Sequence, residues 1–237
     1  MLVLRRCILN SSFCILLAVY LALMLLLDIG GIDIWLASRF YAAEGYQWAL
    51  RDHWLTENIL HKGARKLNYI FAVAVLVTTM HYLWLNKTKP ALTKAYLALT
   101  LSLISSFALV AYFKAITNIA CPWSLALFGG TEPYIHLLQP RPSYLSYSQC
   151  FPAGHASVGY AWVALYYFFR YSRPEYRFIG LTAGLVGGLV LGVTQQLRGA
   201  HFMSHDITTF FICVCCAKVC FALFFKPEKT SGNPNAT

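Results

Sequence analysis

Six long runs of apolar residues, separated by short charged segments, constrain the fold of this chain more than any other feature. A helix needs about 20 mostly apolar residues to cross a bilayer. The candidate runs are residues 8–27, 67–85, 95–116, 155–169, 178–197 and 207–225, and a helix through 53–66 could extend the second run upstream. We therefore expect an all-α polytopic membrane protein, a single domain over residues 1–237 built as a six-transmembrane-helix bundle. Residues 230–237 are expected to form a disordered tail.

Lysine and arginine gather in alternate segments between the runs. They lie before the first run, after the second, after the fourth and after the last, where the positive-inside rule predicts cytoplasm. Both termini are then cytoplasmic. The net charge of +10 reflects topology rather than nucleic-acid binding, and the expected surroundings are membrane lipids. The segment between the first two runs carries both signs of charge, and its aromatic-rich stretch 34–41 could lie along the membrane interface or form a surface loop.

Three groups of ionisable residues fall at helix ends on the opposite, outer side: Lys114, His155 and the cluster of Arg198, His201, His205 and Asp206. Lysine and arginine without a ring of carboxylates indicate that an anion is bound. A glycine just before a helix, Gly154, lets backbone N–H groups face an oxyanion. Two imidazoles can divide nucleophilic and acid–base work. With only nine Asp and Glu in the chain, we expect no metal site and no cofactor.

Two cysteines, Cys121 and Cys150, fall in the one long outer loop, whereas the others lie in or near apolar runs. An exterior pair in an oxidising compartment favours a disulfide, with two unpaired buried thiols as the alternative.

The order of these residues resembles the membrane-bound type 2 phosphatidic acid phosphatase family. That family has the motifs Lys-x6-Arg-Pro, Pro-Ser-Gly-His and Ser-Arg-x5-His-x3-Asp on a six-helix bundle. The corresponding residues here diverge in part: Lys114-x6-Cys121-Pro122, Pro152-Ala153-Gly154-His155, and Gln195, His201 and His205 in the third motif.

The resemblance implies a role for each matching residue. His201 would attack phosphorus and form a phosphohistidine, and His155 would protonate the leaving oxygen and later act as the base. Lys114, Arg198 and Gly154 would hold the phosphate. Arg141 could return the missing guanidinium or be a surface arginine. Either His205 or Asp206 would orient His201. The remaining histidines (His53, His61, His81 and His136) are interpreted as structural.

The resemblance implies a metal-independent phosphatase acting on a lipid phosphate or diphosphate. The expected location is a bacterial cytoplasmic membrane with the site facing the periplasm. Two other functions stay open at this stage. One is a lipid phosphotransferase using the same phosphohistidine, and the other is a degenerate family member that binds lipid phosphates without catalysis. The sequence does not indicate an oligomeric state.

Overall fold

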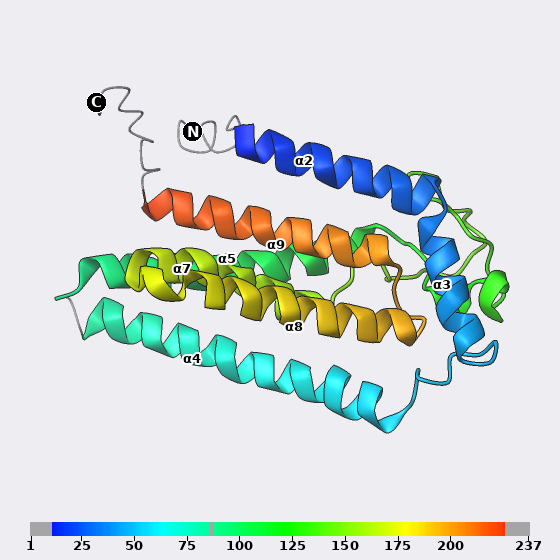
Figure 1. The fold of residues 1–237 in the computed structure, drawn as a ribbon, viewed down its shortest axis with the longest axis horizontal. Helices are drawn as coiled ribbons and strands as arrows, with labels where there is room; N and C mark the ends of the chain where they lie inside the picture. The colour runs from blue at the N-terminus through cyan, green and yellow to red at the C-terminus, as the bar shows by residue number, and fades with distance from the viewer. Residues whose placement is uncertain (1–10, 86–87, 226–237) are drawn as a thin grey trace, which may run out of the picture.

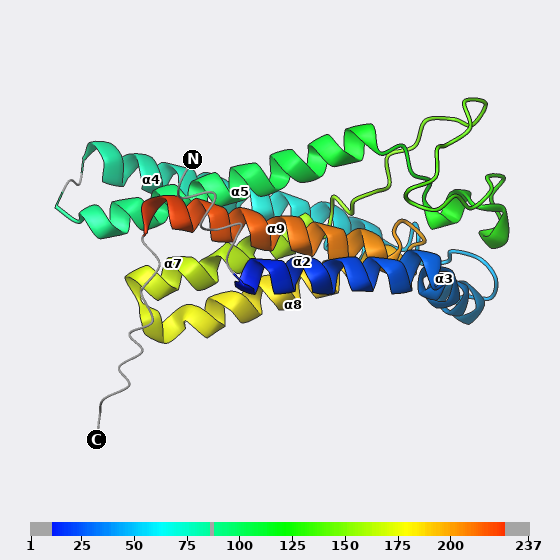
Figure 2. The same cartoon turned by 90° about the horizontal axis from the view of Figure 1, so that it is seen from above.

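A computed structural model describes residues 11–85 and 88–225, and within this part the chain is all helix and loop, with no β-strand. The long helices run side by side along one axis (Figure 1), and the same arrangement is seen from above in Figure 2. The start of the first apolar run, both termini and the expected tail 230–237 lie outside the described residues.

Five helical stretches are long and apolar enough to cross a membrane: Ser11–Ile29, Leu55–Trp84, Pro90–Ile116, Pro174–Leu197 and Met203–Phe224. They contain α2 (Ser11–Met24) with π-helix η1 (Leu25–Ile29), π-helix η2 (Leu55–Gly63) with α4 (Ala64–Trp84), α5 (Pro90–Ile116), the short η6 (Pro174–Tyr176) with α8 (Arg177–Leu197), and α9 (Met203–Phe224). The upstream extension of the second run is therefore confirmed.

The fourth predicted run differs from the others, because it consists of three consecutive short pieces. They are α6 (Ser157–Tyr160), the 3-10 turn η5 (Ala161–Val163) and α7 (Ala164–Ser172). The turn from Gly154 to Ala156 takes up the start of the run, so helix begins only at Ser157. The expected count of six spanning helices stays a prediction.

Glycines spaced four apart let α8 pack closely against this broken helix. A Cβ atom at Gly184 would lie 2.4 Å from the Val163 backbone nitrogen, and one at Gly188 would lie 2.0 Å from the Tyr160 ring. In lipid no hydrophobic driving force brings helices together, so their association depends on close packing. Small residues at this spacing let the two helix backbones approach each other closely. The close contact fixes α6 and η5, and with them the turn that carries His155.

A second, smaller core closes one end of the bundle. Helix α3 (Ile32–Ala43) crosses this end (Figure 1) and packs on the long loop 117–156, which contains η3 (Pro122–Ser124) and η4 (Ala126–Phe128). Asp28 accepts hydrogen bonds from Tyr134 Oη at 2.6 Å and from the Leu137 amide at 3.2 Å. Because residues 32–43 are helical, the interpretation of 34–41 as a surface loop is wrong, and its place at a membrane interface stays a prediction.

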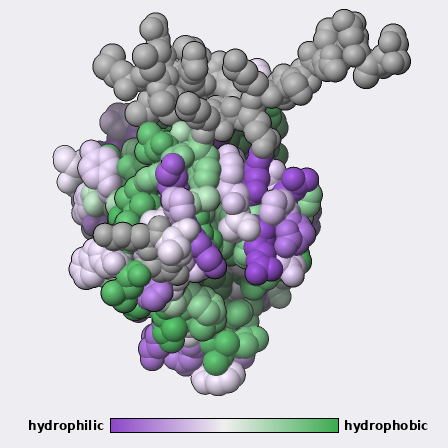
Figure 3. All heavy atoms as spheres, turned by 90° about the vertical axis from the view of Figure 1, so that its left-hand side faces the viewer, coloured by the Kyte–Doolittle hydropathy of each residue, from purple (hydrophilic) through white to green (hydrophobic). Residues whose placement is uncertain are grey.

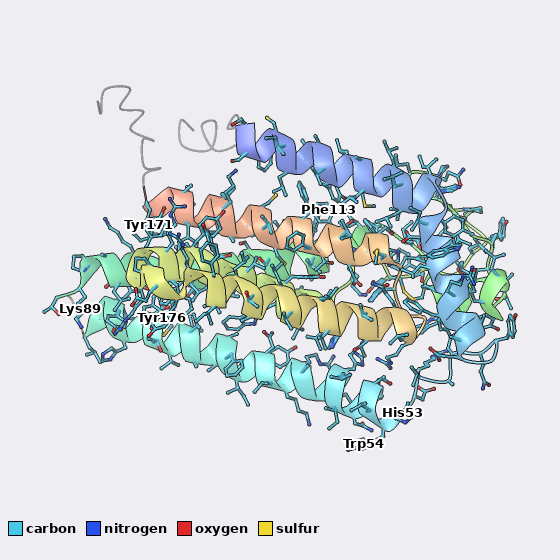
Figure 4. All side chains as sticks on the ribbon, in the orientation of Figure 1. His53, Trp54, Lys89, Phe113, Tyr171 and Tyr176 are labelled. Carbon is cyan, nitrogen blue, oxygen red and sulfur yellow. A yellow bond between two sulfur atoms is a disulfide. The ribbon has the colours of Figure 1, made fainter. Side chains whose placement is uncertain are left out.

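The helix bundle has two ends, and Lys114 lies near the end that is opposite to Lys89. Figure 4 shows Lys89, Tyr171 and Tyr176 at one end and His53 and Trp54 at the other. Seen end-on from the side of Lys89, hydrophilic side chains lie among hydrophobic ones on the end face (Figure 3). Helix α5 starts at this end and carries Lys114 in its last turn, so Lys114 lies near the opposite end, beside the 117–156 loop.

Candidate active site

A cavity of about 450 Å³ opens where α5, α8 and the 117–156 loop meet the start of α4. Four cationic or imidazole side chains that the sequence predicted for the site line this cavity, together with side chains that the sequence did not predict. The lining residues are His61, Arg65, Lys114, Cys121, Trp123, Gln149, Cys150, Gly154, His155, Val158, Gln195, Arg198, Ala200 and His201. Lys114, His155, Arg198 and His201 thus come together, although they come from the last turn of α5, the turn before α6, the end of α8 and the turn before α9.

His201 is buried in the short turn between α8 and α9, and its ring is held by His205. The two Nδ1 atoms lie 3.3 Å apart, and His205 is one helical turn further along α9. Burial is the main cause that lowers the pKa of His201 well below its usual value, and the charge of Lys114 adds to it. In the tautomer in which His201 Nδ1 carries the proton and donates it to His205 Nδ1, the Nε2 atom of the neutral His201 ring keeps its lone pair for nucleophilic attack.

His155 enters the cavity from the turn before α6. Its Nε2 atom donates to the Leu60 carbonyl oxygen at 2.8 Å, which leaves Nδ1 as the free nitrogen. The pKa of His155 is lowered to about 4. Burial is the largest cause, the hydrogen bond to Leu60 acts against it, and the charges of His61, Arg198 and Arg65 contribute to the lowering. The site without an anion therefore keeps His155 neutral, and a bound phosphate would raise this pKa.

Arg198 is fixed by three partners at the end of α8. Its Nε donates to the Arg51 carbonyl at 2.8 Å, Nη1 donates to Gln195 Oε1 at 3.1 Å, and Nη2 pairs with Glu57. Gln195 occupies the family's arginine position, and its buried Nε2 has no hydrogen-bond partner. Since arginine only donates, the bond to Arg198 assigns Oε1 and Nε2 of this amide. An unpaired donor of this kind is suited to an incoming anion.

The glycine of the second motif brings the backbone close to Lys114. A Cβ atom at Gly154 would lie 3.5 Å from Lys114 Cδ, which is an ordinary contact distance, so the Lys114 side chain lies beside this turn. Ala153 is fully buried and does not line the cavity. Ser157 does not replace the family's serine, because its hydroxyl donates back to the Gly154 carbonyl at 2.6 Å.

Two residues predicted for the site lie elsewhere. Asp206 accepts a hydrogen bond from Gln196 Nε2 at 2.5 Å and packs against Gly192, because it points toward α8 rather than toward His201. Arg141 forms an ion pair with Glu132 at 2.5 Å and lines a separate, smaller cavity. Its guanidinium is therefore committed to the loop's own carboxylate.

Three residues of the η2–α4 helix were missed by the sequence analysis. His61 and Arg65 line the cavity, and Glu57 contacts both His61 and Arg198. The signal that could have found them is their spacing of four residues, which puts all three on one helix face. Nothing in the sequence indicated that this face turns toward His155.

Cys121 and Cys150 are paired as a disulfide, with Cα atoms 5.2 Å apart. Both line the cavity, and the Cys150 amide donates to the Ile119 carbonyl at 3.1 Å. The disulfide thus joins the loop just after α5 to the segment that leads into the His155 turn. Within the described part of the chain, no group of three or more His, Cys, Asp or Glu side chains is arranged to hold a metal ion.

Comparison with known proteins identifies the family of this chain. The family model described as the PAP2 superfamily matches residues 95–229, more than half of the chain, and this stretch holds Lys114, His155 and His201. The comparisons with curated proteins and with solved structures gave no match. The chain therefore belongs to the PAP2 superfamily, whose members are phosphatases.

Proposed function

We propose that this protein is a membrane phosphatase that hydrolyses a lipid phosphate or diphosphate through a phosphohistidine on His201. The observation that carries the proposal is the convergence of His201 and His155 with Lys114 and Arg198 around one cavity. Binding of an anion alone needs cations and does not need two imidazoles, one of which is oriented by a third. The site also suits phosphoryl transfer, where positioning and charge stabilisation supply most of the rate.

The two half-reactions use these residues in turn. Lys114, Arg198 and the free amide nitrogen of Gln195 bind the phosphoryl oxygens. His201 attacks phosphorus with its Nε2 lone pair, the new N–P bond forms, and the P–O bond to the lipid breaks. His155, protonated once the phosphate is bound, gives its proton to the departing oxygen. In the second half-reaction water loses a proton to a base in the cavity, its oxygen bonds to phosphorus, and the N–P bond breaks with its electron pair returning to His201, which releases inorganic phosphate.

A second cavity supports a lipid as the substrate. It has a volume of about 540 Å³, lies between α4, α6 and α8, and is lined mainly by apolar side chains such as Leu67, Phe71, Trp162 and Leu191. Val158 lines both cavities. An apolar chain in this cavity would have its phosphate next to His155 and Arg198, as a lipid phosphate requires.

We also infer the orientation in a bacterial cytoplasmic membrane. Lys89, Lys94, Arg170 and Arg173 belong to the end of the bundle away from the cavity, which suits the cytoplasmic side. The disulfide lies at the cavity, which suits an oxidising compartment such as the periplasm. The site then opens toward lipids of the outer leaflet.

The test is phosphate release by the purified full-length protein in detergent with EDTA present. The substrates are phosphatidate, phosphatidylglycerophosphate and undecaprenyl diphosphate, and His201→Ala is assayed beside the wild type. We expect release from at least one lipid, unaffected by EDTA, and none above background from His201→Ala. His81→Ala is the matched control, because His81 lies exposed at the far end of α4.

The other outcomes separate the alternatives. A phosphohistidine that forms without phosphate release, and that passes its phosphoryl group to an added lipid alcohol, would identify a phosphotransferase. Lipid phosphate binding with neither a phosphoenzyme nor release would identify a non-catalytic binder. Release abolished by EDTA would contradict the metal-independent mechanism.

A further inference from the structure

His61 is hydrogen-bonded to a carboxylate, as the general-base histidine of a Ser-His-Asp triad is. Its Nδ1 atom lies 3.0 Å from Glu57 Oε2, one turn earlier on the same helix. Glu57 also contacts Lys62 Nζ at 2.9 Å and Arg198 Nη2, so its carboxylate is fixed on three sides. With Nδ1 bound to Glu57, the free nitrogen of His61 is Nε2.

The ring of His61 lines the candidate active-site cavity beside His155. It lines the same wall as His155 and His201, and its centroid is 4.6 Å from that of His155 in an edge-to-face arrangement. Its side chain is 31% exposed, which lets protons exchange with solvent. The segment that carries Glu57 and His61 is the π-helix η2, and π-helical turns are frequent at functional sites.

The two imidazoles have different partners. His155 donates to a neutral carbonyl, that of Leu60, and within the described residues no carboxylate is bonded to it. His61 has the Glu57 carboxylate, which stabilises the imidazolium that forms when a base takes up a proton. The surroundings therefore suit His61, rather than His155, to end a step positively charged.

We propose that His61, oriented by Glu57, is the general base of the second half-reaction, in which water hydrolyses the phosphohistidine. This inference rests on the proposed function. A water O–H bond breaks and its proton goes to His61 Nε2. The water oxygen bonds to phosphorus, the N–P bond breaks, and its electron pair returns to His201. His61 then gives the proton to solvent. The family resemblance assigns both proton transfers to His155, and the present geometry divides them between two histidines.

The decisive experiment follows the phosphoenzyme directly. The full-length protein in detergent is mixed with the lipid phosphate that the wild type hydrolyses fastest, labelled with ³²P, and quenched in alkali, which preserves phosphohistidine. In His61→Ala we expect the intermediate to form within about threefold of the wild-type rate and to accumulate, while steady-state turnover falls roughly 100-fold or more. In His155→Ala the intermediate should form slowly and not accumulate.

Several variants separate catalysis from structure. His61→Gln keeps a hydrogen bond to Glu57 and should accumulate the same intermediate, which covers the case in which His61→Ala fails to fold. Glu57→Gln should accumulate less, since His61 remains. Added imidazole should restore turnover to His61→Ala, a result that a structural role does not produce. His81→Ala, on the same helix but far from the cavity, should behave as wild type.

Two results would overturn the inference while leaving the proposed function intact. In one, His61→Ala and His61→Gln lose formation of the intermediate and turnover in equal measure. In the other, neither quantity changes. A wild-type protein that forms no phosphoenzyme and releases no phosphate would instead overturn both proposals together.

Discussion

The side-chain oxygen of Gln195 holds Arg198 in the cavity, accepting a hydrogen bond from Nη1 at 3.1 Å. The two residues are three apart near the end of α8, so their side chains share one face of the helix. The family's arginine position is therefore taken by an amide that fixes another arginine and keeps its own N–H₂ group unpaired. The arginine of this chain thus stands three residues later than in the family motif, and a neutral amide donor occupies the motif position.

Substitution of Gln195 tests this division. Gln195→Leu removes the proposed hydrogen bond to the phosphate and the hydrogen bond to Arg198, and we expect kcat/KM to fall roughly 10- to 100-fold, corresponding to about 1.5–3 kcal/mol. Gln195→Glu still pairs with Arg198 but puts a negative charge against the phosphate, so the loss should be larger. Steady-state kinetics on the preferred lipid phosphate measure both. Equal activity of Gln195→Glu and the wild type would rule out contact between this residue and the phosphate.

Asp33 gives a pH-dependent contribution to stability. It is 2% exposed, and its Oδ1 accepts the Ser204 amide at 3.1 Å at the start of α9. The pKa of Asp33 is raised to about 6. Burial is the largest cause, the hydrogen bonds from Ser204 act against it, and the charge of Asp28 contributes to the rise. The folded state therefore favours the protonated acid. The contribution of the protonated Asp33 to the free energy of unfolding is complete below pH 3.8, the usual pKa of this group. It is lost as the pH rises through about 6.

The Asp33→Asn variant isolates this effect, because asparagine keeps the oxygen that caps α9 but cannot ionise. Relative to this variant, the wild type should lose up to about 3 kcal/mol between pH 4 and pH 8. Thermal unfolding in detergent at a series of pH values measures the difference in Tm. A difference that stays constant over this range would contradict the buried, protonated Asp33.

The disulfide between Cys121 and Cys150 should support both stability and activity. Its residues are 29 apart in sequence, and bridging a loop of this size contributes roughly 2–4 kcal/mol. We expect dithiothreitol to lower the Tm and to reduce phosphate release, because both cysteines line the cavity. The double variant Cys121→Ala/Cys150→Ala should start at the reduced level and no longer respond to dithiothreitol. A wild-type protein unaffected by the reductant would contradict the prediction.

The contact between α8 and η5 can be tested with two neighbouring glycines. At Gly184 an added Cβ would lie 2.4 Å from the Val163 backbone nitrogen, whereas at Gly187 the nearest atom, Gly159 Cα, would be 3.5 Å away. Gly184→Ala forces the backbones apart and should cost about 2 kcal/mol or more, with loss of activity as the His155 turn shifts. Gly187→Ala, at ordinary contact distance, should be tolerated. Similar Tm values for the two variants would contradict the close packing.

The sequence by itself determined the helical class and the group of residues most directly tied to chemistry. Apolar runs of spanning length can satisfy their backbone groups in lipid only as helices. Because successive helices reverse direction, Lys114, His155 and His201 had to fall at the same end, and the structure brings them to one cavity. Local spacing and hydropathy carry this information, which is why the sequence was sufficient for it.

Only the tertiary structure decided which other side chains complete the cavity. His205 lies beside His201 and Asp206 turns away, because the rotation of α9 is fixed by packing against α8 and by the cap from Asp33. Arg141 pairs with Glu132 within its loop. Glu57 and His61 reach the site through the packing of a π-helical segment. The rotation of a helix about its axis and the path of a long loop depend on contacts distant in sequence, and no local pattern encodes them.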